Sequence, residues 1–290
     1  MMLFGLLRLL RRGFRKVFPG LKLSGLVAVI STGCAVVQVF LVKPYIVPVV
    51  RRLPYIGWMG SGIEIWGYQT CAVGYIVSLC STCVMAPYTT WMLGKRTRDG
   101  SIDPVRWILT MPYHVLLQLK LYIERLSGEE NQYDMIMDGL YLGSWPAHVG
   151  LLPTDDDIKL GVIDVTCELP CRVREVCDGY HLIPVWDTHS PTPEMIQQAV
   201  EWAMDFMGRM DDNSVRRKND TRRLFVHCAH GHGRSATVLG AILIALNEED
   251  SAESVVKLMK RGRPRVRLNS RQLAGLQAWI DQYHSLKRNT

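Results

Sequence analysis

The stretch Val226–Ser235, VHCAHGHGRS, places one cysteine, three histidines, two glycines and an arginine within ten residues. The apolar run RRLFVHC (222–228) is typical of a buried strand, and the run ATVLGAILIAL (236–246) is apolar on nearly every side, which is typical of a central helix. A strand, a glycine-containing loop and a helix in this order aim several backbone N–H groups at one point, where the helix dipole favours negative charge. The stretch therefore predicts an anion-binding cradle.

Short apolar runs bounded by turn residues recur upstream of this stretch. They are LYLGS (140–144), GVIDVT (161–166) and YHLIPV (180–185), and each is typical of a buried strand. Helical patterns separate or follow them: one begins at Thr192 as a cap with proline next to it, and another begins at about Ser270. Strands that alternate with helices predict an α/β fold in which helices flank a mostly parallel central sheet.

Two residues of the cradle carry chemistry. Cys228 ends the expected strand and Arg234 begins the expected helix, so the sulfur would lie at the bottom of the cradle while the guanidinium offers two parallel donors to an oxyanion. The same positive field lowers the pKa of the thiol and favours a nucleophilic thiolate near neutral pH. A thiolate in a phosphate-sized, donor-lined bowl is suited to in-line attack on phosphorus.

At these residues the chain resembles a known family. His227, Cys228, five intervening residues, Arg234 and Ser235 look like the HCX5R(S/T) signature of the cysteine-dependent phosphatases, and residues 135–290 resemble the compact dual-specificity class. Together with YLGSWP and PVWDTHSP upstream, the sequence of this motif is similar to that of a membrane-linked branch near the mitochondrial lipid phosphatases and their plant relatives. The resemblance implies hydrolysis of phosphate monoesters through a phosphocysteine intermediate, without a metal or another cofactor.

The resemblance also implies roles for single residues. Cys228 would be the nucleophile, Arg234 would bind the phosphoryl oxygens, and Ser235 would donate a hydrogen bond to the sulfur. The phosphate-binding loop would comprise Ala229, His230, Gly231, His232, Gly233 and Arg234. His230 and His232 would line its rim, which is usually lysine-rich in phosphoinositide-directed members of the family and here has no lysine.

A general acid is also needed, to protonate the leaving oxygen and later to activate water. Asp187 in PVWDTHSPTP is the candidate, because it follows an expected strand and opens a loop that resembles the family's mobile acid loop. The alternative for Asp187 is a turn residue that caps its own backbone. Asp164, at the end of GVIDVT, is a weaker candidate for the acid and is interpreted as structural. His189 is interpreted as a solvated loop residue, with assistance to Asp187 as the alternative.

Metal binding by this stretch is not expected. His227, Cys228, His230 and His232 are suitable zinc ligands by type, but their spacing fits neither a zinc finger nor a metalloprotease helix. The other cysteines of the domain, Cys167, Cys171 and Cys177, are expected to be reduced, with a reversible disulfide to Cys228 as the alternative.

The N-terminal part is typical of a membrane-embedded segment. Twenty uncharged residues lie between Lys22 and Lys43, enough for a helix of about 30 Å that crosses a hydrocarbon core. A second uncharged run, 65–93, contains two glycines and a proline and is less regular, so one or two transmembrane helices are predicted, two forming a hairpin. The alternative is a buried hydrophobic hairpin in a soluble protein.

Charge and orientation follow from the same region. Residues 1–134 carry 15 Lys and Arg against 7 Asp and Glu, whereas residues 135–290 carry 19 against 20, so the C-terminal part is not a nucleic-acid binder by composition. Basic residues precede the first run and follow the second, and the positive-inside rule then places the C-terminal domain in the cytosol or an organelle matrix. The basic opening segment is also compatible with an organelle-targeting sequence.

The predicted organisation has four parts. A basic segment (1–22) and a membrane region (23–94) precede an amphipathic helix with a linker (95–134), and the phosphatase-like domain follows (135–290). The amphipathic stretch YHVLLQLKLYIERL (113–126) would lie on the membrane surface or pack on the domain.

Together these features favour a membrane-anchored phosphatase that acts on phosphoprotein or on phospholipid. The alternative is a catalytically idle phosphate-binding adaptor at the membrane.

Overall fold

The computed structural model describes residues 31–53, 59–82, 86–126, 128, 130–155, 158–208 and 222–289. The chain forms two compact units. A helical unit comprises Met1–Leu93 with Pro104–Lys120, and a sheet-containing unit comprises Gly94–Asp103 with Leu121–Thr290. The basic segment 1–22 and the first part of the predicted membrane region lie outside the described residues.

The helical unit contains a long apolar helix followed by a second helix. The first runs over Ser31–Arg52 and includes the π-helical η1 (Gln38–Ile46) and α3 (Val47–Arg52); it is long and apolar enough to cross a membrane. The second, α4 (Met59–Thr82), covers part of the second predicted span. Among the described residues only Ser31–Arg52 meets this test of length and hydropathy. The number of spans stays a prediction.

Close approach of these two helices depends on small residues. Three glycines spaced two helical turns apart share one face of α4: Gly60, Gly67 and Gly74. A methyl group at Gly67 would collide with the Gln38 side chain, and one at Gly74 would collide with Ser31 Oγ. Glu64, between Gly60 and Gly67 in sequence, forms ion pairs with Lys43 (3.6 Å) and Arg51 (3.5 Å). The glycines therefore permit the contact that these polar groups complete.

The helix α6 (Pro104–Leu126) begins in the helical unit and has a proline inside it. Pro112 cannot donate to the carbonyl of Ile108, four residues earlier. The Gln69 amide of α4 supplies donors instead, to the carbonyl oxygens of Ile108 (2.6 Å) and Leu109 (3.0 Å). Two short elements, α5 (Ala86–Thr89) and η2 (Thr90–Leu93), precede α6.

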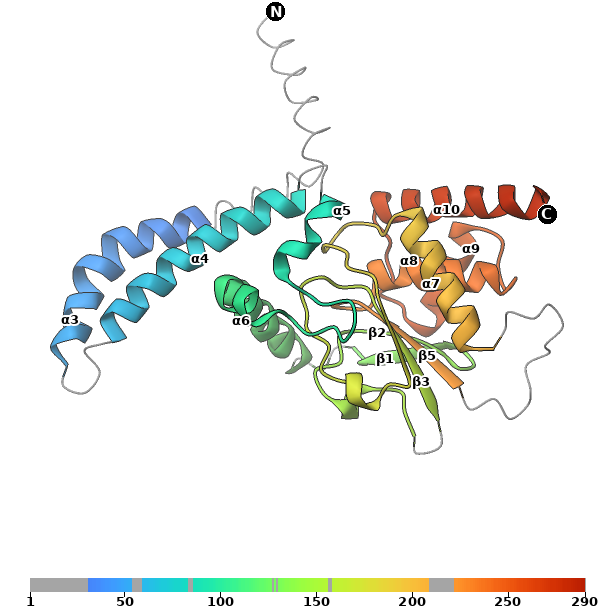
Figure 1. Ribbon diagram of the computed structural model, residues 1–290, viewed down its shortest axis with the longest axis horizontal. Helices are drawn as coiled ribbons and strands as arrows, with labels where there is room; N and C mark the ends of the chain where they lie inside the picture. Colours follow the sequence, from blue (N-terminus) through green and yellow to red (C-terminus); the bar gives the residue numbers. More distant parts are fainter. Residues whose placement is uncertain are drawn as a thin grey trace, which may run out of the picture. The chain divides into compact units, whose positions relative to one another are not determined.

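The second unit is built on a five-stranded sheet of order β1-β2-β5-β3-β4 (Figure 1). The strands are β1 (Tyr133–Met137), β2 (Leu140–Gly143), β3 (Lys159–Asp164), β4 (Gly179–Leu182) and β5 (Arg222–His227). β1 pairs antiparallel with β2, and all other pairs are parallel. The predicted fold class, a mostly parallel sheet flanked by helices, is confirmed, whereas β1 was not predicted.

Helices of the same unit gather on one side of this sheet (Figure 1). They are α7 (Pro193–Phe206), α8 (Arg234–Ala245), α9 (Ala252–Gly262) and α10 (Ser270–Asn289), and two short turns, η3 (Val149–Leu151) and η4 (Arg174–Val176), lie in the loops. As predicted, Thr192 caps α7 through a bond from Met195 N (3.3 Å). α8 is buried from Arg234 to Ile244 because other helices and β5 contact it.

Successive side chains of a strand point to opposite faces of the sheet, and the core is therefore divided into two clusters. On β5, Leu224 and Val226 join the large cluster with the helices, while Phe225 joins a smaller cluster on the opposite side of the sheet with Leu160 and Val162 of β3. Both faces of β5 are therefore buried, which explains its continuous apolar run. The site that follows β5 is consequently carried by a strand whose last four residues are buried.

A segment outside the predicted domain 135–290 belongs to this unit. Lys95 and Asp164 form an ion pair of 2.6 Å with side chains 1% and 0% exposed, and Lys95 also donates to Thr166 Oγ1 (2.7 Å). The carbonyl of Gly100 accepts a bond from Cys171 N (2.8 Å). The structure thus adds residues 94–103 and 121–134 to the unit, and the boundary at residue 135 stays a prediction.

Candidate active site

The predicted cradle joins the end of β5 to the start of α8. Cys228 is the first residue after the strand and is buried, and α8 begins at Arg234. Gly231 has a φ of 78°, and a Cβ there would come within 2.5 Å of the backbone of Gly143 on β2. Only glycine fits this turn without displacement of the neighbouring strand.

Two hydrogen bonds reach the sulfur of Cys228. Gly231 N and Ser235 Oγ each donate to Sγ at 3.2 Å. Burial raises the pKa of this thiol, but the charge of Arg234 and the bonds from Ser235 and Gly231 outweigh it, so that the pKa lies below its ordinary value. The cradle therefore favours the thiolate form of Cys228.

Arg234 is 1% exposed and is fixed by several acceptors. Its Nη2 and Nη1 donate to the two carboxylate oxygens of Glu168 (2.7 and 3.0 Å), and Nη1 also donates to the carbonyl of Val185 (2.7 Å). Burial lowers the pKa of the guanidinium, but the charges of Glu168, Asp187 and Cys228 raise it well above its ordinary value. The remaining donor, Nε, is buried without a hydrogen-bond partner among the described residues.

The Nε of Arg234 is a donor that an anionic ligand would satisfy. A buried donor without an acceptor is costly, because the group has lost its water. An oxyanion held by the N–H groups of the cradle would supply the acceptor. Arg234 therefore has the two properties that a phosphate-binding arginine needs, a fixed orientation and a free donor.

Asp187 lies on the loop between β4 and α7, as the sequence predicted. Its side chain is 58% exposed, and Oδ1 is 3.2 Å from Arg234 Nη2 and accepts a bond from Thr188 N (3.0 Å). Trp186 before it is buried, so the loop is anchored where the carboxylate leaves the core. The structure thus brings Asp187 to the same guanidinium whose charge lowers the pKa of Cys228.

Side chains of α10 and the loop before it hold this acid loop. Asn269 Nδ2 donates to Thr188 O (2.8 Å), and Gln272 Nε2 donates to His189 O (3.2 Å). Gln272 is buried and also adjoins the cradle, because a Cβ at Gly233 would come within 2.7 Å of its Oε1. Gln272 therefore contacts both the cradle and the acid loop, a role that the sequence did not indicate.

His189 is half-buried rather than fully solvated. Its Nδ1 lies 3.2 Å from the carbonyl of Asp187, and its Nε2 lies 3.3 Å from Arg271 Nη1. Burial lowers the pKa of this imidazole. The ring is a fixed part of the acid loop.

Arg263 supports the cradle from its carbonyl side. It is 1% exposed and donates to Gly231 O (3.1 Å), His230 O (2.9 Å) and the carboxylate of Asp134 (2.6 Å). The basic run 260–267 has the composition of a solvated face, but the Arg263 side chain within it is buried. Its charge fixes the loop carbonyls, which leaves the loop N–H groups available on the other side.

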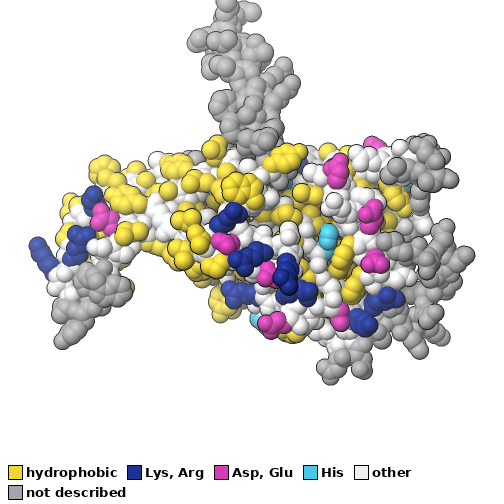
Figure 2. Space-filling model, viewed as in Figure 1, with side chains coloured by type: hydrophobic (Ala, Val, Ile, Leu, Met, Phe, Trp, Pro, Cys, Tyr) yellow, Lys and Arg dark blue, Asp and Glu magenta, His cyan; other side chains and the backbone are white. Residues whose placement is uncertain are grey.

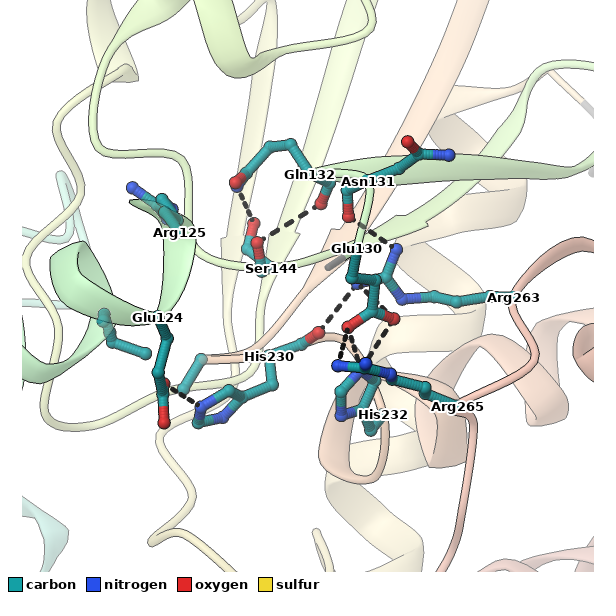
Figure 3. A pocket seen from close by; sticks show the side chains of 12 residues that line it. Glu124, Arg125, Glu130, Asn131, Gln132, Ser144, His230, His232, Arg263 and Arg265 are labelled. Atoms are coloured by element: carbon teal, nitrogen blue, oxygen red, sulfur yellow. Dashed lines mark hydrogen bonds and ion pairs between the residues drawn. The ribbon is translucent and has the colours of Figure 1, made fainter. Parts of the chain in front are cut away.

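The two loop histidines point into a neighbouring pocket (Figure 3). His230 Nε2 lies 3.0 Å from Glu124 and His232 Nε2 lies 2.7 Å from Glu130. Burial lowers the pKa of His232, although Glu130 opposes this shift. Neither Cys228, Arg234 nor Asp187 lines this pocket. The structure thus directs both imidazoles toward the segment that precedes β1.

Asp164 has the structural role that the sequence suggested. Besides Lys95, it accepts bonds from Thr166 Oγ1 (2.7 Å) and Tyr180 OH (2.9 Å). Burial raises the pKa of this carboxyl, but Lys95 and His227 outweigh it, and the pKa lies below its ordinary value. Because Asp164 pairs with His227 across β3 and β5, this buried charge lies next to the residue that precedes Cys228.

The other cysteines of this unit are free thiols. Cys167 and Cys177 are buried and Cys171 is half-buried. Burial raises the pKa of each of them, that of Cys177 to about 12. The described residues contain no group of three or more His, Cys, Asp and Glu side chains placed to hold a metal ion. The thiol of lowered pKa is thus the one in the cradle.

Comparison with known proteins gives matches among solved structures. No family model and no curated protein matches the chain. PTPMT1 is 19% identical and covers 55% of this chain and 99% of its own (TM-score 0.41), and PTPMT1 in complex with PI(5)P is 19% identical over 54% and 99% (0.42). Human DUSP28 is 19% identical over 53% and 99% (0.43). The roles of single residues rest on the site geometry.

Proposed function

We propose that this protein is a membrane-anchored, cysteine-dependent phosphatase that hydrolyses phosphate monoesters. The observation that carries the proposal is the shared position of a thiol of lowered pKa and a fixed, buried guanidinium with one free donor, at the N-terminus of α8. Attack on a phosphoryl group requires a nucleophile and donors for the phosphoryl oxygens in one site. Asp187, 3.2 Å from Arg234, supplies a carboxyl group at the mouth of the same site.

In the first step the Cys228 thiolate attacks phosphorus opposite the leaving oxygen. The S–P bond forms as the P–O bond breaks, and Asp187 in its protonated form donates a proton to the leaving oxygen. Arg234 Nε and the N–H groups of the cradle stabilise the negative charge on the equatorial oxygens. The product is the free alcohol or phenol together with a phosphocysteine.

In the second step water attacks the phosphocysteine. The Asp187 carboxylate accepts a proton from this water, the S–P bond breaks and the thiolate leaves. Ser235 Oγ, 3.2 Å from Sγ, stabilises the departing sulfur charge. Inorganic phosphate is released and the acid form of Asp187 is restored for the next substrate.

Hydrolysis should depend on Cys228 and on no metal. The full-length protein, reconstituted in lipid vesicles, would be given lipid phosphates and phosphopeptides in buffer with a chelator. Cys228→Ser should abolish turnover, while Cys177→Ser, which changes a buried thiol elsewhere in the unit, should retain it. A phosphorylated enzyme intermediate, trapped by acid quenching, should be found in the parent protein and not in Cys228→Ser.

The same panel distinguishes a lipid substrate from a protein substrate, and it distinguishes an enzyme from an adaptor. Preference for a lipid phosphate or for a phosphopeptide identifies the substrate on which the anchored domain acts. Binding of phosphate without turnover by the parent protein would instead establish a phosphate-binding adaptor. The lowered pKa of Cys228 supports the enzyme, because an adaptor needs the arginine and the N–H groups but no nucleophile.

A further inference from the structure

The exposed face of α6 is apolar. Six large residues at helical spacing are 48–69% exposed: Ile108, Leu109, Leu116, Leu119, Ile123 and Leu126. A helix on the surface of a water-soluble protein shows the opposite pattern, with its apolar face turned inward. This face extends along most of the 23 residues of α6.

The other face of α6 is the one that is covered. His114 is fully buried and Leu121 is 4% exposed. Gln69 of α4 binds two backbone carbonyls of α6, and the guanidinium of Arg106 lies 5.0 Å from the Trp91 ring. The protein contacts of α6 thus use its more polar face and leave its apolar face outward.

The neighbouring helices of the same unit show which environment this face meets. On Ser31–Arg52, which is long and apolar enough to cross a membrane, Phe40 is 67% and Leu41 is 54% exposed, and on α4 Ile65 is 66% exposed. Figure 2 shows hydrophobic side chains over much of the helical unit. The apolar residues of α6 from Ile108 to Leu119 therefore belong to the same compact unit as these exposed apolar side chains.

Charges on α6 fit the boundary of a bilayer. Lys120 lies beside the apolar face, and the helix has no acidic residue before Glu124. Basic residues that border an apolar helical face are typical of helices that lie in the headgroup region, where they meet lipid phosphates. Among the described helices, Ser31–Arg52 meets the test of length and hydropathy for a membrane span and α6 does not.

We propose that α6 lies in the plane of the bilayer surface, with its apolar face among the acyl chains. This inference rests on the membrane-anchored part of the proposed function and not on catalysis. Its last turn carries Glu124, which contacts His230 of the cradle loop at 3.0 Å.

Lipid photo-crosslinking in full-length protein tests this placement. Photoreactive p-benzoylphenylalanine would replace Leu116 or Ile123 in α6, Phe40 in the long apolar helix, and Leu273, an exposed residue of α10. Each variant would be reconstituted in phosphatidylcholine–phosphatidylserine vesicles and irradiated. We expect phospholipid adducts from the α6 positions and from position 40, and none from position 273.

Other placements of α6 would give other crosslinked products. Adducts of the α6 positions with protein, within one chain or between two copies, while position 40 still labels lipid, would overturn the placement of α6 and leave membrane anchoring intact. An absence of lipid adducts at position 40 as well would refute both. Equal labelling of position 273 would also overturn the inference, because α6 would then be no different from an ordinary surface.

Discussion

At the scale of single residues, Glu168 decides how Arg234 is held. It lies 66 positions before the arginine and binds both Nη atoms, and nothing in its local sequence marks it. Removal of its charge should leave the guanidinium less fixed and the site less preorganised. For Glu168→Gln we expect kcat/KM to fall about tenfold to a hundredfold, as for loss of a charged hydrogen bond. Steady-state kinetics checks this, with the exposed Glu175→Gln as control.

Ser235 offers a second test, because its hydroxyl helps to hold the pKa of Cys228 below its ordinary value. Ser235→Ala removes this donor, so the pKa should rise and the thiolate should form at higher pH. The rate of Cys228 alkylation by iodoacetamide, followed against pH, should therefore have a higher midpoint in the variant. Ser251→Ala, at the cap of α9, should leave the midpoint unchanged. An unshifted midpoint in Ser235→Ala would contradict the role of this bond.

The sequence indicated the residues of the site that are local to one motif. Cys228, Arg234 and Ser235 occur within eight positions, and Asp187 follows a recognisable strand. Glu168 and Gln272 were not predicted, because their contacts depend on how distant loops meet across the sheet. The direction of His230 and His232 could not be predicted either, since it is set by Glu124 and Glu130, about a hundred positions earlier.

At the scale of elements, β2, β3, β5 and α8 were predictable from continuous apolar runs, because extensive burial leaves that pattern. β4 was predictable because the run 180–185 continues past the strand into the buried residues Ile183 and Val185. β1 was not predicted, since its half-buried residues lack that pattern. α9 is strongly amphipathic, and the two residues Lys260 and Arg261 make its last turn basic. Its end carries Arg263 into the core beneath the cradle.

The glycines of α4 give a prediction at this scale. A leucine at Gly67 would meet the Gln38 side chain, whereas Gly62 on the same helix has open space. Gly67→Leu should destabilise the pair of helices by about 1–3 kcal/mol through overpacking, and Gly62→Leu should not. Thermal unfolding in detergent micelles, followed by circular dichroism, measures both. Equal melting temperatures for the two variants would show that the helices do not depend on this close approach.

At the scale of the whole molecule, the structure assigns the segment 94–103 to the sheet-containing unit rather than to the helical unit that flanks it in sequence. Composition could not show this, because the segment is polar and short. The ion pair of Lys95 and Asp164, 69 positions apart and both buried, holds this segment to β3. Such a pair couples the chain before α6 to the strand beside the cradle.

Breaking this pair should be costly, because Lys95→Met leaves the Asp164 carboxylate buried without its cation. We expect a loss of about 3–5 kcal/mol in unfolding free energy, and a smaller loss for the double variant Lys95→Met/Asp164→Asn, in which no charge remains. Arg96→Met, which removes the exposed pair with Asp103, should cost at most about 1 kcal/mol. Urea unfolding monitored by tryptophan fluorescence measures all three.

The pH dependence of this stability follows from the sign of the shift. The pKa of Asp164 is held below its ordinary value in the folded protein, so the pair stabilises fully above the unfolded pKa, and this contribution is lost as the pH falls through the folded pKa. The difference in unfolding free energy between the parent protein and Lys95→Met should therefore shrink on acidification. A difference that is constant with pH, or a cost no larger than that of Arg96→Met, would show that the segment is not held by this buried charge.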